Sequence, residues 1–285
     1  MYDAENRPSG YPFTVYLIDS VKKVKVQIKD AQDSVIRNLT FKVDSGFNRQ
    51  YWGFEQKGKR AAGMSKVGGG GGRRRMMEEA PADPEEEREY RGRAVLAGKY
   101  KVVVTANKQK DSMWIEVKAD DRLADRTLVV KKQDALMEKH QPSADKFNSA
   151  MDQLDEVDAL LLDLKAEWKD KKDKGVDTLN KAHKAITASA KVLREFIFGK
   201  KQEKQGYGTV DVITPISIIR DASMLIGGKN TMPGEQEDRK LQEAETAIQT
   251  VIAKANEFFT KDWADFRKLV EATPIKKFKD YESIK

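Results

Sequence analysis

Paired carboxylates are the first residues in this sequence that could do chemistry. Asp152, Asp155 and Glu156 lie close together in the stretch DQLDEVDALLLDL, where one helix would bring them near one another. Such a group could serve acid–base or di-metal chemistry. The Glu-x-x-His pattern of di-metal bundles is missing, however, as is the glycine and terminal glutamate spacing of a calcium loop. We therefore interpret these carboxylates as a solvated helix face.

Histidine and cysteine provide no recognisable catalytic or metal-binding motif in this sequence. His140 and His183 are the only histidines, and no spacing joins them to a serine nucleophile or to a cluster of metal ligands. The absence of cysteine excludes disulfides, thiolate nucleophiles and cysteine-ligated zinc. The sequence thus predicts no catalytic, cofactor-binding or metal-binding residue, and no cofactor.

Aromatic residues allow two interpretations. Tyr51, Trp52 and Phe54 are grouped in a strand-like run, and Trp114 lies in another. Flat aromatic faces suit sugar rings, so Trp52 and Trp114 are candidate stacking residues for a carbohydrate. Aromatic residues of strands more often belong to a core. Both interpretations remain open from the sequence.

A glycine-rich segment could contact anions. Five glycines precede Arg73, Arg74 and Arg75, but no GxxxxGK[ST] pattern of a P-loop is present. The three arginines are candidate anion contacts. Because Glu85 to Glu87 follow about ten residues later, the segment can neutralise itself, and we do not expect nucleic acid as a partner.

Composition sets wider limits. The chain has 285 residues, enough for two modest domains that each bury a core. Its net charge of +7 would permit binding to polyanions, but 53 basic residues are interleaved with 46 acidic ones, which is typical of a surface of mixed sign. No stretch approaches the roughly 20 apolar residues that span a bilayer, and the N-terminal residues lack the pattern of a signal peptide.

Two periodicities divide the chain. From Phe13 to about Val117, apolar and polar residues alternate, as in KVKVQIKD, and turn signals separate the runs. This pattern predicts short antiparallel strands in a small β-sandwich over residues 1–120, with a long charged loop insertion at about 58–94. The insertion is tolerable because the entropy of loop closure grows only slowly with length.

Beyond Asp120 the apolar residues recur three or four apart, which predicts amphipathic helices. We expect a first helix from near Ala124 that Pro142 kinks or divides, and a second helix over about 179–196. A short third helix over 215–226 and a last one from near Pro233 follow. An antiparallel bundle of about four helices over 121–285 would bury their apolar faces.

The order of several motifs resembles a known arrangement. It is similar to the C-terminal region of exported bacterial proteins with BNR/Asp-box or sortilin-type β-propellers, which are often labelled glycosyl hydrolases. Gly53 departs from the aspartate that this family usually has after the tryptophan. The resembling pieces are ENRPSGYPFTVYL, KVKVQIKDAQDSVIRNL, GFNRQYWGF, LAGKYKVVVTANKQKDSMWIEVKADDRL, TMPGEQEDRKLQEAETAIQTV and FFTKDWADFRKLVEATPI.

The resemblance implies an immunoglobulin-like domain that follows a propeller and leads into a helical bundle. The propeller, where any hydrolase activity is expected, is not in this chain, so no catalytic residue is carried over. We expect a non-catalytic assembly module that contacts a β-propeller or another envelope protein, exported to the periplasm or cell surface. The opening at ENRPSG indicates a piece of a longer polypeptide or a separately encoded remnant. The alternative is the substrate-contacting part of a glycan-processing hydrolase, with Trp52 or Trp114 contacting substrate.

Overall fold

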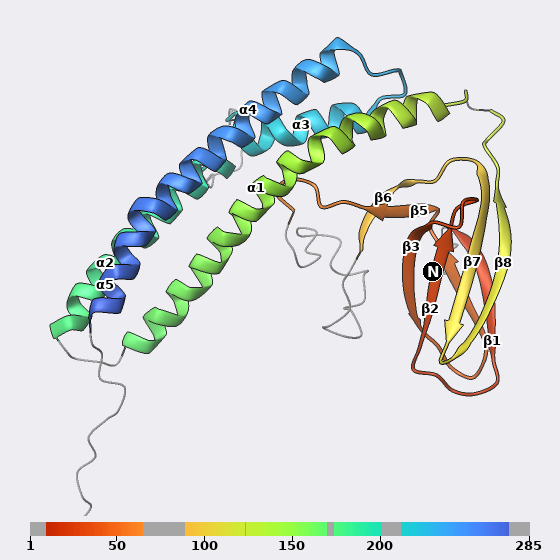
Figure 1. The fold of residues 1–285 in the computed structure, drawn as a ribbon, viewed down its shortest axis with the longest axis horizontal. Coiled ribbons are helices and arrows are strands. Elements are labelled where there is room, and N and C mark those ends of the chain that lie inside the picture. The colour runs from red at the N-terminus through yellow and green to blue at the C-terminus, as the bar shows by residue number, and fades with distance from the viewer. Residues whose placement is uncertain (1–9, 65–88, 123, 170–173, 201–211, 274–285) are drawn as a thin grey trace, which may run out of the picture. The chain divides into compact units, whose positions relative to one another are not determined.

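The computed structural model describes residues 10–64, 89–122, 124–169, 174–200 and 212–273. The chain divides into two compact units (Figure 1). Unit 1 comprises Met1–Arg60 and Val67–Leu128, and unit 2 comprises Ala61–Lys66 and Val129–Lys285. Antiparallel sheets therefore precede a group of four packed helices, as the two periodicities predict. Residues 61–64 fall within the range expected for the loop insertion, but they belong to the helical unit.

Unit 1 is built from antiparallel strands in three sheets. A four-stranded sheet has the order β3-β2-β7-β8, β1 pairs with β4 in a two-stranded ribbon, and β5 pairs with β6. The strands are β1 (Tyr11–Leu17), β2 (Lys23–Lys29), β3 (Val35–Lys42), β4 (Gly46–Trp52), β5 (Glu55–Gly58), β6 (Tyr90–Ala94), β7 (Gly98–Ala106) and β8 (Gln109–Val117). Of these, β6 lies inside the range expected to be loop.

The core of unit 1 follows from the alternation of β2. Val24, Val26 and Ile28 are buried, whereas the lysines and the glutamine between them face outward. The ribbon supplies the other side of the core, since the Phe13 ring lies 6.0 Å from that of Phe41 and the Trp52 ring lies 5.7 Å from that of Tyr100. Complete burial stabilises by about 1.5–3 kcal/mol for a residue such as Ile28.

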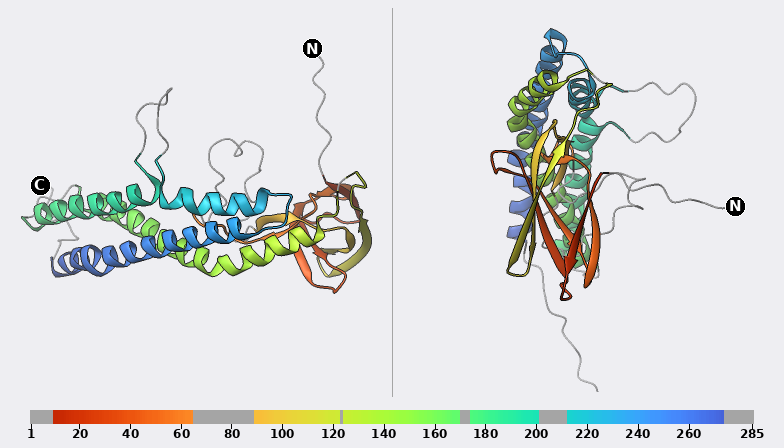
Figure 2. Two further views of the ribbon diagram at one scale, coloured as in Figure 1. Left: turned by 90° about the horizontal axis from the view of Figure 1, so that it is seen from above. Right: turned by 90° about the vertical axis from the view of Figure 1, so that its right-hand side faces the viewer.

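Four helical rods make up most of unit 2. They are α1 (Thr127–Trp168), α2 (Lys174–Phe198), α3 (Pro215–Gly228) and a composite of α4 (Glu235–Phe258), the π-helical turn Phe259–Trp263 and α5 (Ala264–Ala272). The composite rod contacts α3 with its first part and α2 with its last, and α2 and α3 follow one another along it (Figure 2). Pro142 lies inside α1, which continues through it rather than being divided.

The helices pack through one apolar cluster that α1 enters with Phe147, Leu154 and Trp168, each almost fully buried. The segment 61–64 joins the same cluster through Ala62. Asn148 of α1 fixes this segment with two hydrogen bonds, accepting the Gly63 amide at 2.9 Å and donating to the Ala61 carbonyl at 3.2 Å. Gly63 has a φ of +77°, which L side chains rarely adopt, and a Cβ there would lie 2.5 Å from Ile216 Cδ1, so this position favours glycine.

Polar contacts fix the turn between α3 and α4. The buried carboxylate of Glu237 accepts the Gly234 amide at 2.8 Å and also pairs with the Lys229 ammonium. Gln133 of α1 donates to the Lys229 carbonyl at 2.9 Å. The bond to Glu237 satisfies the Gly234 amide at the N-cap of α4, and the bond from Gln133 satisfies a carbonyl at the end of α3. The hydrogen bond from Lys229 is the main reason that the pKa of Glu237 lies below its ordinary value.

Replacing Glu237 with Gln should lower the free energy of unfolding by about 1–3 kcal/mol at pH 7, because a hydrogen-bonded charge is lost. The lowered pKa means that this contribution is present above the ordinary value of 4.5 and disappears as pH falls through the folded-state pKa. Urea denaturation at several pH values measures both effects. As a control, Glu243→Gln on the exposed side of α4 should change stability by less than about 0.5 kcal/mol. Equal losses in the two variants would contradict the role of Glu237.

Candidate functional site

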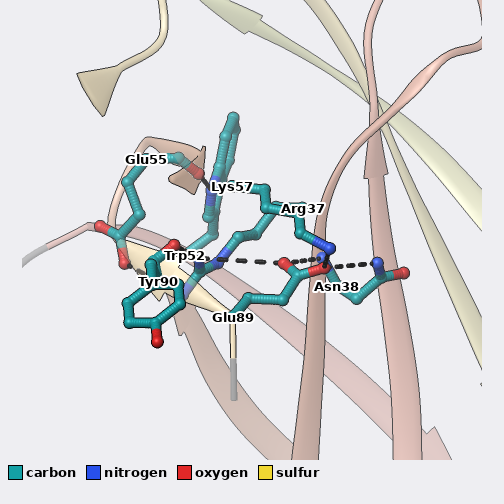
Figure 3. Close-up of polar contacts among 7 residues, drawn as sticks. All are labelled: Arg37, Asn38, Trp52, Glu55, Lys57, Glu89 and Tyr90. Carbon is teal, nitrogen blue, oxygen red and sulfur yellow. Dashed lines mark hydrogen bonds and ion pairs between the residues drawn. The ribbon is translucent and has the colours of Figure 1, made fainter. Parts of the chain in front are cut away.

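A polar cluster surrounds the buried side chain of Arg37 in unit 1, where β3 meets the β5–β6 pair (Figure 3). We call Arg37, Asn38, Glu55, Lys57 and Glu89 the Arg37 cluster. Arg37 lies opposite Ile28 of β2, so it occupies a core-facing position of β3, and its side chain is only 8% exposed. A guanidinium at such a position needs partners to offset its lost hydration. They come from segments more than 15 residues away in sequence.

The guanidinium of Arg37 lies among one carbonyl and two carboxylates. Its Nη1 donates to the Tyr90 carbonyl at 2.7 Å and lies 3.8 Å from the Glu89 carboxylate. Its Nη2 lies 4.0 Å from the Glu55 carboxylate. Its Nε is buried and has no hydrogen-bond partner among the described residues. Arg37 thus joins β3 to both strands of the β5–β6 pair.

Glu89 has the densest set of polar contacts in the cluster. Its carboxylate accepts the Asn38 amide at 3.0 Å and the Asn38 side-chain Nδ2 at 2.8 Å, and the Lys57 ammonium lies 3.4 Å away (Figure 3). Burial alone would raise the pKa of Glu89, but the hydrogen bonds from Asn38 and the charge of Lys57 together lower it. The carboxylate is therefore ionised at neutral pH.

The Arg37 cluster is suited to fastening rather than to catalysis. A general acid at neutral pH needs a raised pKa, and Glu89 has a lowered one. Its carboxylate oxygens are already engaged by Asn38 and Lys57. Glu89 and β6 follow residues 65–88 in the chain, so the contacts hold the segment that returns to the sheet. We conclude that the cluster closes the base of the insertion on β3.

The two candidate stacking tryptophans lie in different surroundings. Trp52 is 1% exposed, donates from Nε1 to the Glu55 carbonyl at 2.9 Å, and packs against Phe54 and Tyr100. Trp114 on β8 is 58% exposed, and the Lys101 ammonium lies 5.8 Å from the centre of its ring. Of the two indoles, only Trp114 offers a face to a ligand in this structure.

The candidate anion contacts Arg73, Arg74 and Arg75 lie outside the described residues. The acidic run on α1 faces α2 at one point, where Arg194 pairs with Asp155 at 2.7 Å and with Asp158 at 2.6 Å. Within the described ranges, no group of three acidic, histidine or cysteine residues is placed to hold a metal ion.

The two histidines have separate structural settings in unit 2. The Nε2 of His183 lies 2.8 Å from the Leu161 carbonyl, and its ring packs edge-on against Trp168. His140 of α1 is 6% exposed, and its Nε2 has no hydrogen-bond partner in the described part of the chain. Burial lowers the pKa of His140, and the nearby Glu245 carboxylate only partly opposes that effect.

Sequence reasoning missed the Arg37 cluster and an aromatic surface on the ribbon. Arg37 could have been recognised, because in VIRNLTF it takes the same side of the strand as Leu39 and Phe41. For Glu89 we find no comparable signal in the surrounding charged residues. That surface on the ribbon includes Tyr16 and Phe47, which lie directly opposite one another with ring centres 4.9 Å apart.

None of the described helices is both long enough and apolar enough to cross a membrane. No protein-family model, curated protein or solved structure matches this chain.

Replacing Glu89 with Gln should loosen β6 from β3, because a charge-assisted set of hydrogen bonds is worth about 2 kcal/mol. Amide hydrogen exchange in residues 89–95 should become roughly thirtyfold faster at pH 7. Exchange in α4 should not change. The matched control is Glu116→Gln, an exposed carboxylate on β8, which should leave exchange in residues 89–95 within twofold of the wild type. Unchanged exchange in the Glu89 variant would show that the cluster does not fasten β6.

Stability of unit 2 should depend on pH through His140. Because its folded-state pKa lies below the ordinary value of 6.5, the unfolded chain binds the proton first, and stability falls as pH drops below about 6.5. The slope contributed by one group is at most about 1.4 kcal/mol per pH unit. Replacing His140 with Leu should flatten the stability profile between pH 6.5 and 5, as measured by urea denaturation. A wild-type minus variant difference that does not change with pH would contradict this assignment.

Proposed function

We propose that this chain is a non-catalytic assembly module that binds another protein through the ribbon of unit 1. The observation that carries the proposal is the exposed aromatic surface on the outer side of β1 and β4. Phe47 is 82% exposed and Tyr16 is 61% exposed, and Ile18, which follows β1, is 83% exposed. Exposed apolar groups of this size, grouped on one surface, mark interaction sites more often than scattered single residues do.

The composition of this surface favours a protein as the partner. Arg49 and Tyr51 lie on the same side of β4 as Phe47, and the Arg49 guanidinium lies 6.0 Å from the centre of the Tyr51 ring. Tyrosine, phenylalanine and arginine are enriched at protein–protein interfaces, where a few buried aromatic and arginine side chains supply most of the binding energy. We define Tyr16, Phe47, Arg49 and Tyr51 as the aromatic surface.

The motif order that resembles the region after a β-propeller supports a more specific version. In this version unit 1 is an immunoglobulin-like sandwich, unit 2 is its antiparallel four-helix bundle, and the partner is a β-propeller or another protein of the cell envelope. Export to the periplasm or cell surface belongs to the same proposal. The Arg37 cluster supports the non-catalytic part, because its carboxylates are engaged in fastening β6.

Binding of a β-propeller protein should depend on Phe47. Wild-type chain carrying an affinity tag should co-purify a β-propeller protein from its native host. Phe47→Ser should weaken this complex roughly thirtyfold, since a central interface aromatic contributes about 2 kcal/mol. The same capture with Val192→Ser, which alters a residue 66% exposed on α2, is the control for a change in surface apolarity and should bind as the wild type does.

Two results would overturn the proposal. One is equal capture by the wild type and Phe47→Ser. The other is hydrolysis of glycosides or peptides by the purified chain that is lost when a single carboxylate is replaced.

A further inference from the structure

The outer side of the four-stranded sheet carries an unusual concentration of lysine. The register of β2 with β3 and β7 sends Val24, Val26 and Ile28 into the core and their neighbours to the opposite side. We define this opposite side as the lysine face. Its lysines include Lys25, Lys29, Lys42, Lys99, Lys101 and Lys110.

Several of these lysines face one another directly across the sheet. Lys29 lies opposite Lys101, and Lys23 lies opposite Lys42. Like charges at directly opposed positions destabilise a sheet, because their Cβ atoms lie only about 5 Å apart. These directly opposed lysine pairs therefore do not stabilise the sheet by themselves. A ligand of opposite charge would turn the same arrangement into a favourable one.

Among the described residues, two carboxylates lie beside lysines of this face. Glu116 lies opposite Lys99, and Asp33 accepts a hydrogen bond from Lys29 at 2.8 Å. That hydrogen bond is the main cause of the lowered pKa of Asp33, and the charge of Lys101 adds to it. Two of the lysines thus share one carboxylate. In the register of the sheet, Lys25 and Lys110 lie opposite threonines, and Lys42 lies opposite Lys23.

An exposed indole and small polar groups complete the lysine face. Trp114 lies directly opposite Lys101, and 58% of its surface is exposed. Thr40 and Thr105 lie on either side of Lys25, so hydroxyl groups alternate with ammonium groups across the sheet. From standard strand geometry, lysines repeat at roughly 7 Å along a strand and roughly 10 Å across two strands. The face thus combines spaced cations, hydrogen-bonding groups and one aromatic ring.

The side chains discriminate between possible occupants of this face. Lysine is depleted at protein–protein interfaces, which disfavours a second protein contact here. Platforms for single-stranded nucleic acid stack successive bases on aromatic residues, and arginine is the preferred residue for bidentate phosphate recognition. The described strands place Trp114 on this face without a second aromatic ring beside it, and its cations are lysines. A lysine ammonium is a compact point charge that pairs with carboxylates as well as with phosphates. The single aromatic ring and the threonine hydroxyls therefore favour a sugar chain over a nucleic acid.

We propose that the lysine face binds an acidic polysaccharide, with carboxylate groups paired to Lys25, Lys101 and Lys110 and a sugar ring stacked on Trp114. The threonine hydroxyls would then hydrogen-bond sugar hydroxyls. This inference concerns the opposite side of unit 1 from the aromatic surface and does not depend on the proposed protein contact.

Calorimetric titration of the full chain with polygalacturonate tests the proposal. The affinity should fall steeply between about 50 and 200 mM salt, because binding of a polyanion releases its counterions. A Lys25→Gln, Lys101→Gln, Lys110→Gln variant should lose at least about tenfold in affinity. Trp114→Ala should lose about fivefold through the lost stacking contact. A neutral polysaccharide should not bind.

The matched control separates position from net charge. Lys131→Gln, Lys132→Gln and Lys184→Gln remove the same charge from exposed positions of unit 2 and should change the affinity by less than about twofold. Equal losses in the two triple variants would overturn the proposal, as would wild-type binding to polygalacturonate that is no tighter than binding to the neutral polysaccharide. Tighter binding to single-stranded oligothymidylate than to polygalacturonate would also overturn it, in favour of nucleic acid.

Discussion

The alternation of β2 is the constraint on which unit 1 depends. Successive side chains of a strand point to opposite sides, so a run of valine, isoleucine and lysine must make one dry side and one charged side. The dry side meets the β1–β4 ribbon and encloses Trp52. The same register carries Arg37 of β3 to the buried side, where the Glu55 and Glu89 carboxylates and the Tyr90 carbonyl lie beside its guanidinium. The core, the Arg37 cluster and the lysine face are three results of one pattern.

The aromatic surface and the lysine face of unit 1 suit partners of different chemistry. The aromatic surface offers planar rings and an arginine, which gain most when a partner excludes water from them. The lysine face offers solvated charges, which act over a Debye length of about 8–10 Å and weaken with salt. A partner suited to one surface is poorly suited to the other. Unit 1 could therefore hold a protein and an acidic polymer at the same time.

Sequence periodicity predicted much of the fold, because apolar residues that recur at a fixed spacing identify the buried side of a strand or helix. The strand at 23–29 and the starts of α1, α3 and α4 were predicted close to their observed positions, whereas α2 extends beyond the expected 179–196 at both ends. Strand β6 was missed because YRGRA has no apolar alternation, and its pairing with β5 depends on contacts across the insertion. Of the two effects expected of Pro142, division of α1 is not observed, because the helix continues through it. The candidate site was harder to predict from the sequence, because Arg37 and Glu89 meet only after the sheet has formed.

The packing of residues 61–64 against α1 affects how the two units could be exchanged between genes. The chain leaves unit 1 after Arg60, contributes Ala62 to the helical core, and returns to unit 1 before crossing finally near Leu128. Neither unit is therefore one uninterrupted stretch of gene. An exchange at a single boundary near Leu128 would carry the helices away without the segment that contributes Ala62 to their core.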